Sequence, residues 1–214
     1  MDVKVQNQAV ITGGVTKTLQ RYGFIGTVRL IRDVLFSKLV SKNVRLIRYP
    51  YYFRGQSFIR FGKGFTSGVG LRIDAFGSQS NQVIFGGNVE LGDYVHIGAL
   101  ESVTIGDNVL MASKVYISDH DHGLYQGRGD AVSPAEQIQS KKPLQIAPVH
   151  IGNNVWLGEN VCVLKGVHIG DNSIIGASSV VTKSIPANSI AIGAPARVVK
   201  QYDAALKEWV PVNG

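Results

Sequence analysis

The sequence predicts an all-β fold in which the chain winds into a triangular prism of short parallel strands. Three observations support this prediction. An aliphatic residue recurs every six residues from Ile151 to Val181, without a slip, and Gly follows it at four of the six steps. The same period runs from Phe85 to Ile117 with a single two-residue insertion. Six residues make one strand and one turn, so three repeats close a coil, and coils stack at about 4.8 Å.

The leading residue of each repeat is expected to point into the prism, together with the small fifth residue. The glycine after it is expected to allow the unusual backbone angles of a corner. An amphipathic helix would need apolar spacings of three and four, and a β-sandwich would need strict alternation over longer strands. The leading residues are Phe85, Leu91, Ile97, Ile105, Met111, Ile117, Ile151, Leu157, Val163, Ile169, Ile175 and Val181.

The chain divides into three parts around this repeat. Residues 1–43 form an N-terminal segment with an amphipathic helix, in which Phe24, Val28, Ile31, Leu35 and Leu39 follow spacings of 4, 3, 4 and 4. Residues 44–193 form the β-helix, with less regular first coils over 44–80. Residues 194–214 are predicted to be a short helical tail. The N-terminal helix is expected to cap the open end of the prism or to pack on a neighbour. An anionic membrane surface is the alternative, because the helix carries basic residues.

Residues 121–149 interrupt the repeat with a polar, turn-rich segment that has no apolar period. A long excursion of this kind inside a compact domain is usually functional. We therefore predict an extended loop beside the functional site.

Composition limits the class of protein. The net charge of +7 favours an anionic partner, but no nucleic-acid-binding motif accompanies it. The first residues lack the pattern of a signal peptide, and no apolar run is long enough to span a membrane. The single Cys162 fits a reducing compartment. We therefore expect a cytoplasmic protein without nucleic-acid partners.

The most suggestive polar cluster is Asp119, His120, Asp121 and His122, at the point where the loop leaves the repeat. Histidine suits proton abstraction near neutral pH, and a neighbouring carboxylate can orient it. A solvated polar turn is the simpler interpretation of the same residues. A zinc site built from His120, His122 and His150 is a further alternative, although no metal is expected.

The sequence resembles the hexapeptide-repeat acyltransferases, in particular the galactoside, maltose and virginiamycin acetyltransferases and the related polysaccharide O-acetyltransferases. The resemblance covers roughly residues 83–200. It rests on the ISDHDHG turn, the long loop, the run from APVHIGNNVW to IPANSI, and IGAPARVVK. It implies a left-handed parallel β-helix, a homotrimer, and acetyl-coenzyme A (acetyl-CoA) as the acetyl donor.

Carried over residue by residue, the resemblance makes His120 the catalytic base that activates the acceptor hydroxyl. It assigns acetyl-CoA binding to Trp156, Gly158, Ala177, Thr182, Lys183, Arg197 and Lys200. Beside the base, His96, Asp119 and Asp121 are predicted to contact the acceptor.

The predicted function is acetyl transfer to a hydroxyl of a sugar, in a surface polysaccharide or its precursor, at the inner face of the membrane. Alternatives within the same fold are N-acetylation of an amino sugar and acetylation of serine or an antibiotic. Outside this activity, a zinc carbonic anhydrase of the gamma class and a catalytically silent β-helix remain open.

Overall fold

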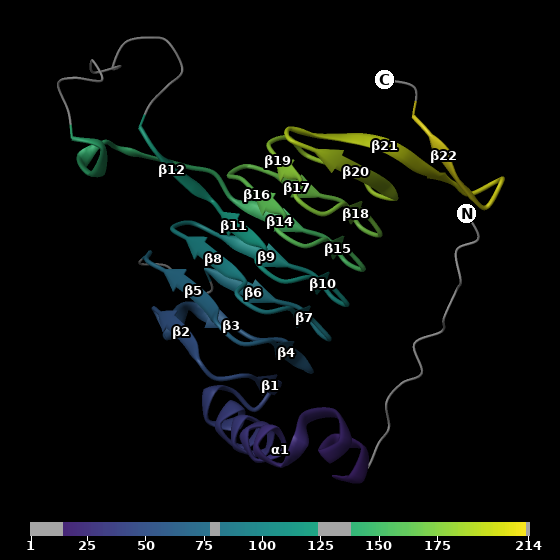
Figure 1. Cartoon of the computed structure of the whole chain (residues 1–214). Helices are drawn as coiled ribbons and strands as arrows, with labels where there is room; N and C mark the ends of the chain where they lie inside the picture. The colour runs from purple at the N-terminus through teal and green to yellow at the C-terminus, as the bar shows by residue number, and fades with distance from the viewer. Residues whose placement is uncertain (1–14, 78–81, 124–137, 213–214) are drawn as a thin grey trace.

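The computed structural model describes residues 15–77, 82–123 and 138–212, and these form a parallel β-helix with one helix at its N-terminal end. Figure 1 shows α1 beneath the first coil, and the C-terminal strands β21 and β22 at the opposite end. The predicted all-β coil of short parallel strands is confirmed.

Three parallel sheets form the faces of the prism, and the chain visits them in rotation. Sheet A holds β1 (Val44–Ile47), β4 (Phe65–Ser67), β7 (Glu90–Leu91), β10 (Leu110–Met111), β15 (Trp156–Leu157), β18 (Ile174–Ile175) and β20 (Ser189–Gly193). Sheet B holds β2 (Tyr51–Arg54), β5 (Leu71–Ala75), β8 (His96–Ala99), β11 (Tyr116–Ser118), β16 (Cys162–Val163) and β19 (Val180–Val181). Sheet C holds β3 (Ile59–Arg60), β6 (Val83–Phe85), β9 (Val103–Ile105), β14 (Val149–Ile151) and β17 (His168–Ile169), and the short helix η1 (Gln56–Phe58) precedes β3.

The interior is a stack of the predicted apolar residues. All twelve leading residues of the repeats are buried, and neighbouring ones pair directly, as Ile117 does with Ile97 and Val163. The fifth residues, such as Val155 and Val161, are buried beside them. Each buried aliphatic side chain contributes about 1.5–3 kcal/mol relative to exposure, so the repeat itself supplies the core.

The glycines after the leading residues serve close stacking and not unusual backbone angles, which corrects the expectation. A Cβ on Gly158 would lie 2.6 Å from the backbone nitrogen of Ala177, and one on Gly170 would lie 2.4 Å from that of Ala187. Neither glycine has a positive φ. The left-handed corner residue is the fourth of the repeat, often Asn, which tolerates this conformation best after Gly.

Five of these corner asparagines form a ladder along one edge of the prism. Each side-chain amide donates to the side-chain oxygen of the next, at 3.0–3.2 Å. The ladder ties coil to coil outside the apolar core. Its members are Asn88, Asn108, Asn154, Asn172 and Asn188.

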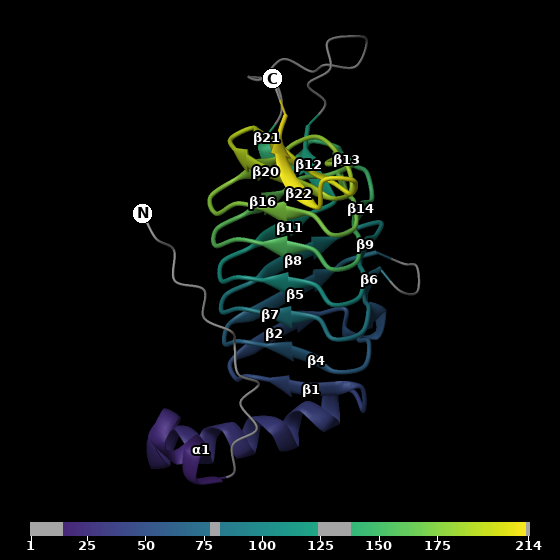
Figure 2. The same ribbon diagram turned by 90° about the vertical axis from the view of Figure 1, so that its right-hand side faces the viewer.

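Helix α1 (Val15–Val40) lies across the end of the first coil, with a break at Gly23, whose φ is 66° (Figure 2). The predicted helix is present and lies over the open end of the prism, one of the two positions expected for it (Figure 2). Its buried residues are polar, namely Thr27, Asp33 and Ser37, and Val40 at its end packs against the core. The predicted apolar stripe is exposed, with Phe24 at 75% and Leu39 at 80%.

Hydrogen bonds to the first strand explain this orientation. The Ser37 hydroxyl accepts the backbone N–H of Ile47 at 2.6 Å, and it contacts the carbonyl oxygen of Asp33 at 2.5 Å. Lys38 Nζ donates to the carbonyl oxygen of Val44 at 2.6 Å. With the apolar stripe turned inward, the backbone N–H of Ile47 and the carbonyl oxygen of Val44 would lose these partners, which is costly for buried groups. Among the described residues no helix is long and apolar enough to cross a membrane.

The C-terminal tail is a β-hairpin, and the predicted helical tail is wrong. Strand β21 (Ala196–Asp203) pairs antiparallel with β20, and β22 (Glu208–Pro211) pairs with β21. The tail carries β-formers such as Val198, Val199 and Trp209, which favour strands over a helix. It therefore covers the edge that the last strand of sheet A would otherwise leave unpaired.

The base of the 121–149 excursion is more regular than a loop. Strand β12 (His120–His122) pairs antiparallel with β13 (Leu144–Ile146), and the short helix η2 spans Gln139–Lys141. Residues 124–137 of the predicted loop lie outside the described residues. The two strands fix the position at which the polar cluster leaves the prism.

Candidate active site

His120 is the first residue of β12, where the chain leaves the corner after sheet B. Pairing of β12 with β13 sets it opposite Ile146. The Ser118 hydroxyl donates to the carbonyl oxygen of His120 at 2.8 Å and accepts its backbone N–H at 3.3 Å. The side chain is 18% exposed. The imidazole is thus held by its surroundings but remains within reach of a ligand.

Asp119 is fully buried behind His120. Its carboxylate accepts the backbone N–H groups of Leu100, Glu101 and Ser102 at 2.7–3.0 Å. Such charge-assisted bonds compensate for the loss of water around a buried charge. This burial corrects the expectation that Asp119 contacts the acceptor, because a carboxylate without exposed surface cannot touch a substrate.

The carboxylate of Asp119 determines which imidazole nitrogen of His120 carries the proton. Asp119 Oδ1 lies 2.8 Å from His120 Nδ1. An ionised carboxylate only accepts hydrogen bonds, so Nδ1 is the protonated nitrogen and Nε2 is the basic one in the neutral ring. No hydrogen bond from a described residue engages Nε2 of His120. The Asp119–His120 pair therefore presents a free base.

A second carboxylate lies on sheet B beside this pair. Asp74 is buried, and its Oδ2 contacts His96 Nε2 at 3.1 Å and Arg72 Nε at 2.6 Å. Its Oδ1 has no hydrogen-bond partner among the described residues, with Arg54 Nε at 3.5 Å. His96, predicted to contact the acceptor, is thus partly exposed and held by Asp74.

Gly98 separates the two carboxylate groups. In the register of sheet B, Asp74 pairs with Gly98, and Gly98 pairs with Ser118. A Cβ on Gly98 would lie 3.3 Å from His120 Cε1. Gly98 is itself buried, so its missing side chain leaves room for the imidazole ring of His120.

The remaining polar residues of the turn face solvent. Asp121 is half exposed and pairs with Lys165 at 2.8 Å, and His122 is exposed. His150 stacks on His168 in sheet C, with ring centroids 4.8 Å apart, and burial followed by repulsion from His168 lowers its pKa. No group of three potential metal ligands occurs in the described part of the chain.

Most of the predicted cofactor residues gather on sheet A and at its edge. Trp156, Ile174, Ile190 and Lys200 form one outward row in the strand register. Gly158 stacks directly on Ala177 in the next coil. Arg197 pairs with Ile192 in the hairpin, and Ile192 lies two residues along β20 from Ile190, which belongs to this row. Gly158 is itself buried, so any contact it makes is through its close-packed backbone.

Thr182 and Lys183 belong to a different corner. They follow β19 directly, and β19 pairs with β16, which pairs with β11. This places them on the same edge of sheet B as Asp119 and His120, two strands further along. Both are exposed.

One prism therefore keeps the two predicted parts of the site apart. His120 lies at the corner after sheet B, whereas the half-exposed Trp156 lies on the face formed by sheet A. A site that uses both residues needs the face of one prism against the corner of another.

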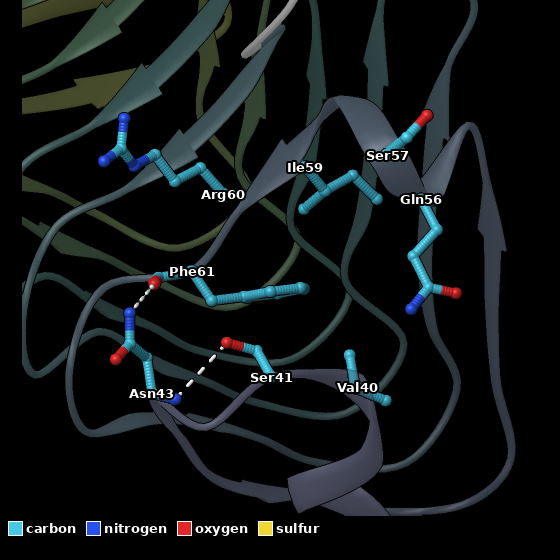
Figure 3. A pocket seen from close by; sticks show the side chains of 8 residues that line it. All are labelled: Val40, Ser41, Asn43, Gln56, Ser57, Ile59, Arg60 and Phe61. Carbon is cyan, nitrogen blue, oxygen red and sulfur yellow. Dashed lines mark hydrogen bonds between the residues drawn. The ribbon is translucent and has the colours of Figure 1, made fainter.

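A pocket of about 490 Å³ lies at the N-terminal end, well before the coil that holds His120 (Figure 3). It opens between the end of α1 and β3, where Asn43 Nδ2 donates to the carbonyl oxygen of Phe61 at 2.9 Å. Arg60 and Val40 contribute to its walls. It contains none of the predicted site residues.

Sequence reasoning missed Asp74 and Ser118 as part of this site. Ser118 precedes the DHDH cluster and is recognisable only from its bonds to the backbone of His120. Asp74 lies in the irregular coils, where no repeat register aligns it with His96. The alternation of apolar and polar residues in Leu71–Ala75 was available as a signal for a strand. It does not reveal that this strand pairs with the one that carries His96.

A parallel β-helix of six-residue repeats, with a histidine beside a buried carboxylate at one corner, is the arrangement that the resemblance to the hexapeptide-repeat acyltransferases predicts. Comparisons with known proteins agree with this class. The family profile described as bacterial transferase hexapeptide (six repeats) matches residues 148–183. WbbJ of Escherichia coli strain K12, named for O-acetyl transfer in lipopolysaccharide biosynthesis, is 47% identical over 195 residues. That match covers 91% of this chain and 98% of WbbJ.

Two further relatives share the architecture. The galactoside O-acetyltransferase of E. coli K12 is 36% identical over 160 residues, which cover 75% of this chain and 62% of that enzyme. The solved maltose O-acetyltransferase of Clostridium difficile 630 is 28% identical with a TM-score of 0.56, covering 80% of this chain and 87% of that one. The chain belongs to the hexapeptide-repeat acetyltransferases, and its fold is their left-handed parallel β-helix.

Proposed function

We propose that this acetyltransferase moves an acetyl group from acetyl-CoA to a hydroxyl of a sugar in a surface polysaccharide or its lipid-linked precursor. The observation that carries the chemistry is the free Nε2 of His120 beside the buried Asp119. The sugar acceptor rests on the likeness to WbbJ over nearly its whole length.

The reaction follows from this pair. His120 Nε2 removes the proton from the acceptor hydroxyl while the oxygen attacks the thioester carbonyl of acetyl-CoA. The tetrahedral intermediate collapses, the carbon–sulfur bond breaks, and the thiolate of coenzyme A takes the proton back from the imidazolium. The Asp119 carboxylate, 2.8 Å from Nδ1, stabilises the imidazolium between these steps. General-base catalysis of this kind is worth about 10²–10⁴ in rate.

The donor binds along the row on sheet A. Trp156 and Ala177 offer an apolar path for the pantetheine arm, and Arg197 and Lys200 lie at its far end, where they meet the phosphates. Thr182 and Lys183 extend the same site from the corner of a neighbouring copy. Acetyl-CoA is made inside the cell, so the enzyme works in the cytoplasm.

The acceptor binds between His120 and His96, two imidazoles that are both partly exposed. His96 Nε2 is held by the Asp74 carboxylate, which is buried and therefore positions His96 without touching the acceptor. Asp121 lies on the outer side of His120, where it pairs with Lys165. A ring with several hydroxyls matches this set of acceptors and donors.

The direct test is acetyl-CoA turnover with a panel of acceptors. Release of coenzyme A is followed with sugars, glycan fragments, amino sugars, serine and an antibiotic. Acceptor-dependent release is expected with hydroxyl sugars, and the product is an ester that mild alkali cleaves. An alkali-stable amide product would move the assignment to N-acetylation. No release with any acceptor would support a silent scaffold.

The active site is shared between copies in a homotrimer, because one prism separates Trp156 from His120. Chains with His120→Ala and chains with Trp156→Ala are each expected to be nearly inactive. In a ring of three, every mixed trimer has one interface that unites both intact residues. Random assembly of equal amounts makes three quarters of the trimers mixed, so about one quarter of the parental activity returns.

Sedimentation first verifies that each variant is a trimer, and co-purification of an untagged variant with a tagged one verifies that mixed trimers form. Mixing each variant with itself provides the control, and neither mixture should gain activity. An active monomer would contradict a shared site. So would mixed trimers no more active than the two variants alone.

A further inference from the structure

The exposed face of α1 is an apolar surface of the described structure that the proposed reaction leaves unused. Past the break at Gly23, its apolar side chains form one stripe, at roughly 100° of rotation per residue. The stripe lies on the opposite side of the helix from Asp33 and Ser37, which face the first coil. It consists of Phe24, Ile25, Val28, Ile31, Leu35, Phe36 and Leu39.

Basic side chains flank this stripe on both sides. With the same rotation per residue, Lys38 falls at one border and Arg29 at the other. Both are exposed. Arg32 falls within the stripe, where its guanidinium pairs with Asp33, and Lys38 Nζ donates to the carbonyl oxygen of Val44. Tyr22 and Tyr49 lie nearby and are also exposed, with Arg21 near the ring of Tyr22 and Arg32 near that of Tyr49. An apolar stripe between cations, with tyrosines alongside, is the pattern of helices that lie in a bilayer interface.

The net charge of the chain is concentrated in this region. Residues 15–48 carry eight Lys and Arg and one Asp, which gives +7, the net charge of the whole chain. The remaining residues carry fourteen charges of each sign. Within the described residues, Arg32 pairs with Asp33 and Arg45 with Glu90, and the other six cations form no salt bridge. Those six are Lys17, Arg21, Arg29, Lys38, Lys42 and Arg48.

This charge discriminates between the possible occupants of the stripe. A second copy of the same face would set +7 against +7, and like charges disfavour that contact. An anionic lipid surface attracts the cations and at the same time accepts the apolar side chains. We propose that α1 docks the enzyme on an anionic membrane surface, with the stripe from Phe24 to Leu39 in the acyl region and Arg29 at the headgroups.

The position of α1 fits this role. The helix lies across one end of the prism, and its polar side is bonded to the first strand (Figure 2). The stripe is therefore turned outward at the end of the molecule. Docking by this end leaves the sides of the prism, including His120, in the aqueous phase. The proposal goes beyond the acetyl transfer proposed above and does not depend on it.

The test measures co-sedimentation of the intact protein with vesicles, which needs no catalysis. The protein is expected to bind phosphatidylcholine vesicles that contain about 30% phosphatidylglycerol at least about tenfold more tightly than pure phosphatidylcholine. Added salt should weaken this binding, because the headgroup attraction is screened. The double variant Ile31→Ser with Leu35→Ser should lose at least about tenfold in affinity, since apolar contacts carry the insertion.

The matched control is Leu206→Ser, at an equally exposed leucine in the turn between β21 and β22, at the far end of the molecule. It should bind like the parent. Melting temperature and molar mass establish that every variant is folded and assembled. Equal binding of the double variant and the parent would overturn the proposal. Equal binding to neutral and anionic vesicles would do so as well. A fall in molar mass of the double variant would show instead that a second copy covers the stripe.

Discussion

The His120→Ala variant should lose at least about 10² in kcat, because the proposed mechanism uses His120 Nε2, which no described residue engages, as the base that activates the acceptor hydroxyl. The side chain is mostly packed but makes no contact that holds the core together, so the fold should persist. The affinity for acetyl-CoA should stay close to that of the parent, since most of the predicted donor residues lie on sheet A and at its edge. Initial rates over a range of acceptor concentrations, with equilibrium binding of acetyl-CoA, measure both effects.

His122→Ala is the matched control, since it removes an exposed imidazole two residues along the same strand. It should retain nearly the full rate. An activity of His120→Ala within about fivefold of the parent would contradict the assignment, because loss of a general base costs more than that. A comparable loss in both variants would point to a disturbed β12–β13 ribbon in place of a lost base.

The six-residue repeat made the buried core predictable, but it did not predict how the residues at the corners pack. Burial of Ile117, Val163 and their equivalents follows from the six-residue period alone. The role of Gly158 did not follow, since its closest neighbour is a backbone atom of Ala177 in the next coil, 19 residues away in the chain. Periodicity identifies which residues point inward, but clashes between coils depend on the stacking distance, which the sequence does not contain.

The two ends of the chain show where local patterns mislead. The apolar period correctly predicts a helix around Val28 and Leu35, but not the face that it buries. The bonds of Ser37 and Lys38 to the first strand decide that orientation, and such long-range bonds have no local signature. At the other end, residues 196–203 pair with the edge of β20, and residues 208–211 pair with them in turn. This pairing outweighs the local pattern from which a helical tail was predicted.

The candidate site was predictable in part. His120 was identified from the resemblance and from its place at the exit of the repeat, and it does lie next to a carboxylate. Which carboxylate supports it was not predictable, because Asp119 and Asp121 flank it symmetrically in the sequence. The structure distinguishes them: Asp119 is buried against three backbone N–H groups, and Asp121 reaches Lys165 at the surface. The backbone N–H groups of residues 100–102 all donate to the Asp119 carboxylate, and this is why Asp119 and not Asp121 supports His120.

The Asp119→Asn variant should therefore lose about 10²–10⁴ in kcat, although Asn has nearly the same shape. In the parent, Oδ2 accepts the N–H groups of Glu101 and Ser102, and Oδ1 faces His120 Nδ1. An amide has one oxygen, and the two backbone donors hold it in the Oδ2 position. Its NH₂ group then faces Nδ1, which must accept a hydrogen bond. The ring proton moves to Nε2, and the base is lost.

Two measurements separate this positioning role from a structural one. The pH profile of kcat should lose the limb that reports the basic form of His120, whereas a merely loosened fold would lower the rate evenly across pH. Asp107→Asn is the control. Asp107 also accepts a backbone N–H, that of Gly87 at 2.6 Å, but it lies at the corner after sheet C, whereas His120 lies at the corner after sheet B. It should lower the melting temperature and leave the pH profile intact. An Asp119→Asn enzyme with the parental rate and profile would show that His120 does not need this carboxylate to act as the base.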